Sequence, residues 1–196
     1  VKVFNWTATM WRGSMTFETP MLFSIGFIFL FVIGGFSGVV CAIVPIDVQV
    51  QDTYYVIAHF HYVLVSGSLF AIFAGIYYWL PKWTGHMYDE TLGKWHFWLS
   101  MFFFNLTFFV QHFLGLAGMP RRIPDYALQF ADFNMISSIG AFGFGTTQLL
   151  FLYVVLKCIR GGAKVSAKPW EGGKTLEWTL PSPPPYHSFQ TPPVIK

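Results

Sequence analysis

The chain has 196 residues, of which 54% are apolar and only 11% are charged, whereas soluble domains carry about 25% charged residues. Too little polar surface is available to cover a water-soluble body of this size, and one residue in five is aromatic. This composition excludes a disordered chain, a disulfide-rich secreted module and an ordinary soluble enzyme.

The charged residues leave four long uncharged stretches, which we interpret as membrane-spanning helices. Each stretch contains between 24 and 29 residues, and a helix needs roughly 20 apolar residues to cross a bilayer. We therefore expect an all-α integral membrane protein with four transmembrane helices between residues 19 and 156. The uncharged stretches are 19–46, 53–81, 95–120 and 133–156.

Four crossings place both termini on one side of the membrane, here called side A, and the opposite face is side B. Ten of the twelve Lys and Arg residues then fall on side A, and only Arg121 and Arg122 fall on side B. The positive-inside rule assigns side A to the cytoplasm or to the mitochondrial matrix. We expect a multi-pass protein of the mitochondrial inner membrane or of a bacterial plasma membrane.

Residues 1–18 form an N-terminal segment expected on side A. The chain begins at Val1 without Met, as a processed or internal piece would, and we expect no signal peptide before the first helix. Cys41 is expected near side B and Cys158 near side A, so the two thiols cannot form a disulfide within the chain.

Asp47 and Asp52 flank the short side B turn between the first two helices. Carboxylates at this place can bind a hard divalent cation such as magnesium, or share a proton with another carboxylate. Both residues can equally be solvated loop charges, and the spacing does not separate these possibilities.

His59 and His61 lie deep in the second helix, in the run Ala-His-Phe-His-Tyr. Ionisable groups inside a membrane helix are costly, and they typically mark a functional site. Residues i and i+2 point about 200° apart on a helix, so the two imidazoles cannot chelate one metal but can serve two separate centres. We interpret them as ligands of two centres, haem iron being a usual partner of imidazole. The alternative is two core histidines bonded to neighbouring helices.

The other four histidines are given no functional role. His112 stands in the third helix beside Gln111 and is interpreted as a structural residue. His86, His96 and His187 lie in or next to side A loops and are expected at the surface.

Arg121 and Arg122 follow the third helix, on the face nearest the histidine pair. Guanidinium groups bind carboxylates through two parallel hydrogen bonds, so an arginine pair here suits the propionates of a haem. The alternative is an interfacial anchor, because arginines at helix ends reach toward water.

Residues 157–196 form a side A tail rich in Pro and Gly. Seven of the twelve prolines lie between Pro169 and Pro193, and Pro183-Pro184-Pro185 favours an extended conformation. We expect the tail to lie along the surface of a larger partner. The alternative is a flexible terminus without fixed structure.

Several motifs together resemble the C-terminal third of subunit I of cytochrome c oxidase, a haem–copper oxidase. They cover the whole chain in order, and the four helices match the last four of that subunit's twelve. The motifs are Asp52-Thr-Tyr-Tyr, Ala58-His-Phe-His-Tyr, Gln111-His-Phe-Leu-Gly, Gly118-Met-Pro-Arg-Arg, Thr175-Leu-Glu-Trp and Ser182-Pro-Pro-Pro.

The resemblance implies that the chain belongs to an oxygen-reducing, proton-translocating enzyme of the respiratory chain. It implies that His59 ligates haem a3 and that His61 is one of two axial ligands of haem a. It further implies that Arg121 and Arg122 contact haem propionates, with Asp47 bonded near one of them.

The resemblance also makes Asp52 a ligand of a magnesium site shared with subunit II. Gln51 stands where the family usually has a magnesium-binding histidine, which puts the affinity or geometry of that site in doubt. Tyr62 matches the pattern of enzymes that oxidise cytochrome c, since quinol oxidases typically have Asn there. Ile123 and Val110 also depart from the family's usual Tyr and Pro, as packing changes.

No copper ligand of the family is expected in this chain, and one haem a ligand is expected upstream. The expected partners are therefore the N-terminal remainder of subunit I, subunits II and III, cytochrome c and the lipid bilayer, with no nucleic acid. Two other functions remain open: a quinol oxidase fragment, and a non-redox channel or transporter that uses the histidines as a proton relay.

Overall fold

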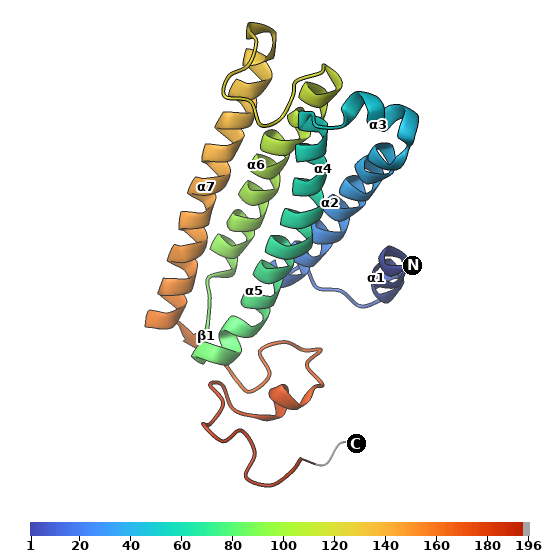
Figure 1. The fold of residues 1–196 in the computed structure, drawn as a ribbon. Helices are drawn as coiled ribbons and strands as arrows, with labels where there is room; N and C mark the ends of the chain where they lie inside the picture. The colour runs from blue at the N-terminus through green and yellow to red at the C-terminus, as the bar shows by residue number, and fades with distance from the viewer. Residues whose placement is uncertain (194–196) are drawn as a thin grey trace.

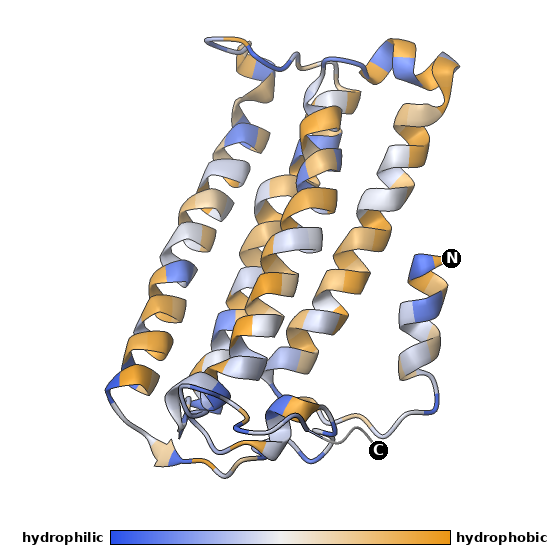
Figure 2. Ribbon diagram, turned by 60° about the horizontal axis from the view of Figure 1, so that its bottom comes forward, coloured by the Kyte–Doolittle hydropathy of each residue, from blue (hydrophilic) through white to orange (hydrophobic). Residues whose placement is uncertain are grey.

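The computed structural model describes residues 1–193, and this part of the chain is almost entirely helical. Four helical spans are long and apolar enough to cross a membrane, as predicted, and they pack side by side (Figure 1). Figure 2 shows hydrophobic residues along the length of the spans, hydrophilic residues in the loops and at the helix ends, and a few hydrophilic positions within the spans. The spans are Thr19–Ala42, Tyr54–Thr84, Glu90–Leu116 and Leu128–Arg160.

The first span is α2 (Thr19–Ala42). Its first turn contains Pro20, and a backbone N–H at this position would have no partner within the helix. The preceding α1 (Lys2–Met10) packs beside the lower half of α2, where the Trp6 ring lies 4.9 Å from Phe27 and 5.8 Å from Phe31. The helix of the segment 1–18 thus lies along the flank of the first span.

The second span contains α4 (Tyr54–Leu64), a π-helical segment η1 (Val65–Phe70) and α5 (Ala71–Thr84). Within η1, the Ser66 and Ser68 hydroxyls donate to the carbonyls of Tyr62 and Leu64. The span ends at Gly85, whose φ of +75° is the left-handed conformation that a helix C-terminus commonly uses.

The third and fourth spans are α6 (Glu90–Leu116) and α7 (Ala131–Arg160), and the latter is preceded by the 3-10 turn η2 (Leu128–Phe130). The side chain of Asp89 caps α6 by accepting from the N–H of Leu92. The side A turn therefore covers only residues 85–89, fewer than the 82–94 that separate the uncharged stretches. Lys82 and Lys94 lie within helices. A helix can include such residues near its end, because their long side chains extend the charge toward water or carbonyl oxygens.

His96 corrects one sequence-based expectation. It was expected at the surface next to the side A loop, but it is fully buried within α6. Its Nδ1 lies 3.0 Å from the Tyr77 hydroxyl and its Nε2 lies 3.4 Å from Oε1 of Gln148. Because α6 starts at Glu90, residue 96 already stands almost two turns inside the bundle.

The side A tail packs against the chain's own helices. Strand β2 (Ala163–Lys164) pairs with β1 (His86–Met87), and the 3-10 turn η3 (Leu176–Thr179) carries Trp178, which is only 1% exposed. The indole of Trp170 donates to the carbonyl of Tyr78 at 2.8 Å. Aromatic side chains thus give the described part of the tail a small core of its own beneath α5.

Candidate functional site on α4

The helix that carries the two histidines is positioned by close contact with α2. In α2, Gly34 and Gly38 stand four residues apart on the face toward α4, a spacing that lets membrane helices approach closely. A side chain at Gly34 would meet the backbone of Tyr62 and Val63 at 3.0 Å. At its start, α4 is capped by Thr53, whose side chain accepts from the N–H of Tyr55.

His59 faces α2 and is held by its Nδ1 atom. This nitrogen lies 2.9 Å from the carbonyl oxygen of Gly34 and 3.1 Å from the hydroxyl of Ser37. Because a carbonyl can only accept, Nδ1 carries the proton and the lone pair of the neutral ring lies on Nε2. A Cβ at Gly38 would come within 2.7 Å of the ring, so only glycine leaves room for this orientation.

His61 faces the other flank of α4, toward α6. Its Nδ1 lies 2.8 Å from the carbonyl oxygen of Ile57, one turn earlier in the same helix. Its ring stacks on Phe108 of α6, with 4.2 Å between centroids and 14° between planes, and it also contacts the ring of Phe60. The different neighbours of the two imidazoles agree with the predicted 200° divergence.

The two α4 histidines share one feature that separates them from His96. Both donate from Nδ1 to a backbone carbonyl and have no hydrogen-bond partner for Nε2 among residues 1–193, whereas both nitrogens of His96 are bonded to side chains. Histidines that ligate a metal typically donate their other ring nitrogen to a carbonyl or carboxylate, which fixes the ring. The arrangement of His59 and His61 therefore fits one axial haem ligand each.

His112 shares both of these hydrogen-bond features but is more enclosed. It is 9% exposed, its Nδ1 lies 3.2 Å from the carbonyl of Phe109, and its Nε2 is buried without a partner among the described residues. Its ring contacts those of Tyr55 and Tyr62, so it fills the α4–α6 interface rather than an outer flank.

On side B, the structure brings Arg121 to Asp52. The Arg121 Nη2 and Nε atoms lie 2.6 and 2.7 Å from one oxygen of the Asp52 carboxylate. A bridge between Thr53 and Pro120 joins the two segments, and the N–H of Arg121 donates to the carbonyl of Asp52 at 2.9 Å. A backbone contact thus holds the start of α4 beside the loop that follows α6.

The remaining predicted side B residues are not gathered with this pair. Asp47 lies in the short helix α3 (Val44–Val50) and is half-buried, while Gln51 and Arg122 are exposed. Among residues 1–193 no carboxylate pairs with Arg122, and no group of three His, Cys, Asp or Glu side chains could enclose a metal ion.

Sequence reasoning missed the residues that orient the histidines. Ser37 and the carbonyl of Gly34 position His59, Phe108 positions His61, and Asn105 accepts from the Tyr62 hydroxyl at 2.6 Å. The spacing of Gly34 and Gly38 was the available signal, because small residues four apart indicate where another helix approaches.

Comparison with protein families supports the resemblance. The family described as "Cytochrome C and Quinol oxidase polypeptide I" matches residues 1–143. The chain is 51% identical over 192 residues to "Cytochrome c oxidase subunit 1" of Cereibacter sphaeroides, covering 97% of this chain and 34% of that protein.

Two further relatives are similar over the whole chain. They are a "Probable cytochrome c oxidase subunit 1-beta" of Nocardia farcinica, 51% identical, and a "Putative cytochrome c oxidase subunit 1-beta" of Streptomyces avermitilis, 52% identical. The chain spans about a third of the length of these relatives.

A solved structure shares the fold. It is described as a "heme-copper terminal oxidase dimer", with a TM-score of 0.67 and 20% identity, and the match covers 75% of this chain and 28% of the other.

Proposed function

Because the chain belongs to the family of cytochrome c and quinol oxidase polypeptide I, we propose that it forms the C-terminal part of the catalytic subunit of a cytochrome c oxidase. In this proposal His59 is the axial ligand of haem a3 and His61 is one axial ligand of haem a. The subunit would act within a complex that transfers electrons from cytochrome c to oxygen and moves protons across the membrane.

The observation that carries the proposal is the state of the two imidazoles on α4. Each ring donates from Nδ1 to a backbone carbonyl, so the Nε2 lone pair is free on both flanks of one helix. A proton relay would need at least one further donor or acceptor at each Nε2, and residues 1–193 supply none there. Ligation of two separate centres accounts for both rings.

When bound, haem iron supplies the one-electron and oxygen chemistry of the reaction. The chain's own residues hold the ligands in place. Gly34 and Ser37 fix the His59 ring, and Phe108 keeps the His61 ring flat against α6. The carbonyl bonds also raise the basicity of each Nε2, which strengthens it as a ligand.

The side B residues complete the proposal. Arg121 and Arg122 would offset haem propionate charge, with Asp47 near one propionate. Arg121 already faces the Asp52 carboxylate, so the two groups would form one charged network at the haem edge. One oxygen of Asp52 has no partner among the described residues and would be available to magnesium, with Gln51 beside it as a weaker oxygen ligand.

The substrate, location and partners follow from the same assignment. The matched relatives are named as cytochrome c oxidases, and Tyr62 fits that pattern, which favours cytochrome c over quinol. Those relatives come from bacteria, which favours a bacterial plasma membrane with both termini in the cytoplasm. The copper ligands, the second haem a ligand and the other subunits would come from the rest of the complex.

Single substitutions in the purified complex test the ligand assignment. His61→Asn should remove the low-spin haem band from the optical spectrum, and His59→Asn should chiefly alter the oxygen-reacting haem. His96→Asn is the matched control, because it replaces a histidine of the membrane region whose two nitrogens are already bonded within the chain.

The spectra are compared at equal subunit content, measured by denaturing electrophoresis. Equal loss of both haem bands in each α4 variant, with the complex still assembled, would contradict separate ligation. Unaltered bands in both variants would contradict ligation altogether.

A further inference from the structure

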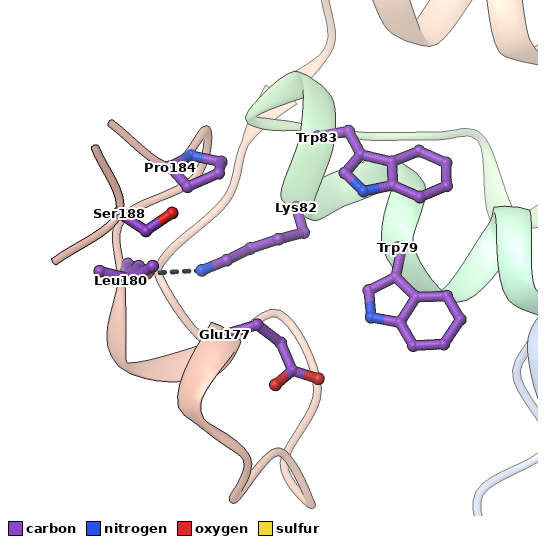
Figure 3. Close-up of a pocket in the computed structure, with 7 residues that line it drawn as sticks. All are labelled: Trp79, Lys82, Trp83, Glu177, Leu180, Pro184 and Ser188. Carbon is purple, nitrogen blue, oxygen red and sulfur yellow. Dashed lines mark hydrogen bonds between the residues drawn. The ribbon is translucent and has the colours of Figure 1, made fainter. Parts of the chain in front are cut away.

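A pocket of about 330 Å³ lies at the side A end of α5, far along the helix from His59 and His61. Figure 3 shows it between the last turns of the helix and the folded tail, with Lys82 crossing from one wall to the other. Its volume is at the lower end of the range that binds small ligands. The pocket is lined by Trp79, Lys82, Trp83, Glu177, Leu180, Pro184 and Ser188.

The helix wall of this pocket stands at the level of the membrane surface. Trp79 and Trp83 are four residues apart in the last turns of the second span, so their indoles lie on one face of α5. They are 39% and 55% exposed. Tryptophans at the ends of membrane helices typically sit among lipid headgroups, because the ring is apolar and its N–H is polar.

The pocket also has one positive group, Lys82 of α5, and one negative group, Glu177 of the tail. Lys82 is 3% exposed, and its Nζ donates to the carbonyls of Leu180 at 2.5 Å and Ala167 at 3.2 Å. Nζ also lies 5.5 Å from the centroid of the Trp178 ring. An ammonium has three donors, so one hydrogen of Lys82 is not bonded to a carbonyl and can turn from the ring to a further acceptor.

Glu177 supplies the negative group. The pKa of Glu177 lies below its usual value, mainly because the Thr175 side chain donates to the carboxylate, with smaller effects from the Trp79 indole and the Lys82 ammonium. The carboxylate is therefore charged at neutral pH, beside two indole rings that attract cations through their faces.

From these features we infer that the pocket binds the headgroup of a zwitterionic phospholipid from the side A leaflet. The headgroup ammonium would lie against Glu177 and the indole of Trp79, and the phosphate would accept from the remaining hydrogen of Lys82. The acyl chains would run along the exposed face of α5. This inference does not rest on the haem ligands proposed for α4.

The charges of the pocket select this class of lipid over an anionic one. An anionic headgroup would bring its phosphate to Lys82 but would have no group to pair with Glu177. A zwitterionic headgroup pairs with both charges, and its ammonium is also attracted to the face of the Trp79 indole.

Lipid binding to the purified complex that contains this chain tests the inference. The complex is delipidated in detergent and titrated with dioleoylphosphatidylethanolamine or with dioleoylphosphatidylglycerol, and bound lipid is counted by native mass spectrometry. We expect the ethanolamine lipid to bind more tightly. Glu177→Gln and Trp79→Leu should each weaken its binding by about two- to fivefold, the factor equivalent to 0.5–1 kcal/mol.

Trp95→Leu is the matched control, since Trp95 is 57% exposed near the side A end of α6 and does not line the pocket. Glu177→Gln keeps the size of the side chain, and the haem spectrum of each variant checks that the complex is intact. Unchanged binding in both pocket variants would overturn the inference, as would equal affinity for the two lipids. Equal weakening in Trp95→Leu, or a protein segment of another subunit filling the pocket in the complex, would overturn it as well.

Discussion

Replacing Gly38 with alanine is the sharpest test of how α2 holds His59. The new Cβ would lie 2.7 Å from Cε1 of the imidazole and 3.4 Å from both ring nitrogens. Carbon atoms in contact prefer about 3.5–4.0 Å, so the ring must move by roughly 1 Å or the two helices must separate. Either movement strains the bond from Nδ1 to the carbonyl of Gly34.

The free-energy change has two opposing parts. Alanine in place of glycine within a helix gains about 1 kcal/mol from reduced backbone entropy in the unfolded chain. Overpacking a filled interface costs about 1–3 kcal/mol. We therefore expect Gly38→Ala to leave the complex about 0–2 kcal/mol less stable and to change the optical band assigned to the His59 centre.

Gly35→Ala is the matched control for this substitution. Gly35 stands in the same helix, but a Cβ there would meet nothing within 4 Å. It should keep both haem bands and raise the thermal unfolding temperature slightly. The reasoning fails if the two variants give the same spectrum and the same unfolding temperature, or if Gly38→Ala alters only the band assigned to His61.

Three further predictions concern charges at the two membrane surfaces. Lys82→Met should release the side A tail, because the hydrogen bonds from Nζ to two tail carbonyls are lost. Limited trypsin digestion should then cut the tail of this variant several times faster than the tail of the control variant Lys94→Met. The hydrogen bond from Lys157 keeps the pKa of Asp89 below its usual value, so this pair stabilises the fold above the ordinary pKa of an aspartate and the effect is lost as the pH falls through the lowered pKa. Unfolding followed from pH 6 to pH 2 should therefore show a smaller loss of stability in Lys157→Met than in the unaltered protein, and equal slopes would contradict the pairing. Arg122→Gln should lower the reduction potential of the nearby haem, because less positive charge then opposes the oxidised form. An unchanged potential in a redox titration of the variant with its full haem content would contradict a contact between Arg122 and a propionate.

The sequence was informative about spans and about the direction of the histidines. Charge gaps predict four crossings because charged groups are too costly to leave in lipid, and an advance of about 100° per residue predicts that His59 and His61 diverge. Both inferences depend only on local spacing along one helix. They needed no knowledge of which helices become neighbours.

The sequence was less informative where partners lie far apart in the chain. The pairing of Arg121 with Asp52 depends on a backbone bridge between segments 67 residues apart, from Thr53 to Pro120. The burial of His96 depends on Tyr77 and Gln148 from two other helices. The tail was expected to lie along a partner surface, because its Pro and Gly content gave no sign of how Trp170 and Trp178 pack against the chain's own helices.

The π-helical segment η1 sets the angular phase between the two halves of the second span. Because π-type bonding accommodates one more residue per turn than an α-helix, every side chain after Phe70 is rotated by about 100° relative to a continuous α-helix. Deleting one residue from η1 would restore regular pitch. It would keep His59 and His61 in place and turn Trp79 and Lys82 away from the tail. The π-helical segment therefore fixes the direction of the side chains in α5 relative to those in α4.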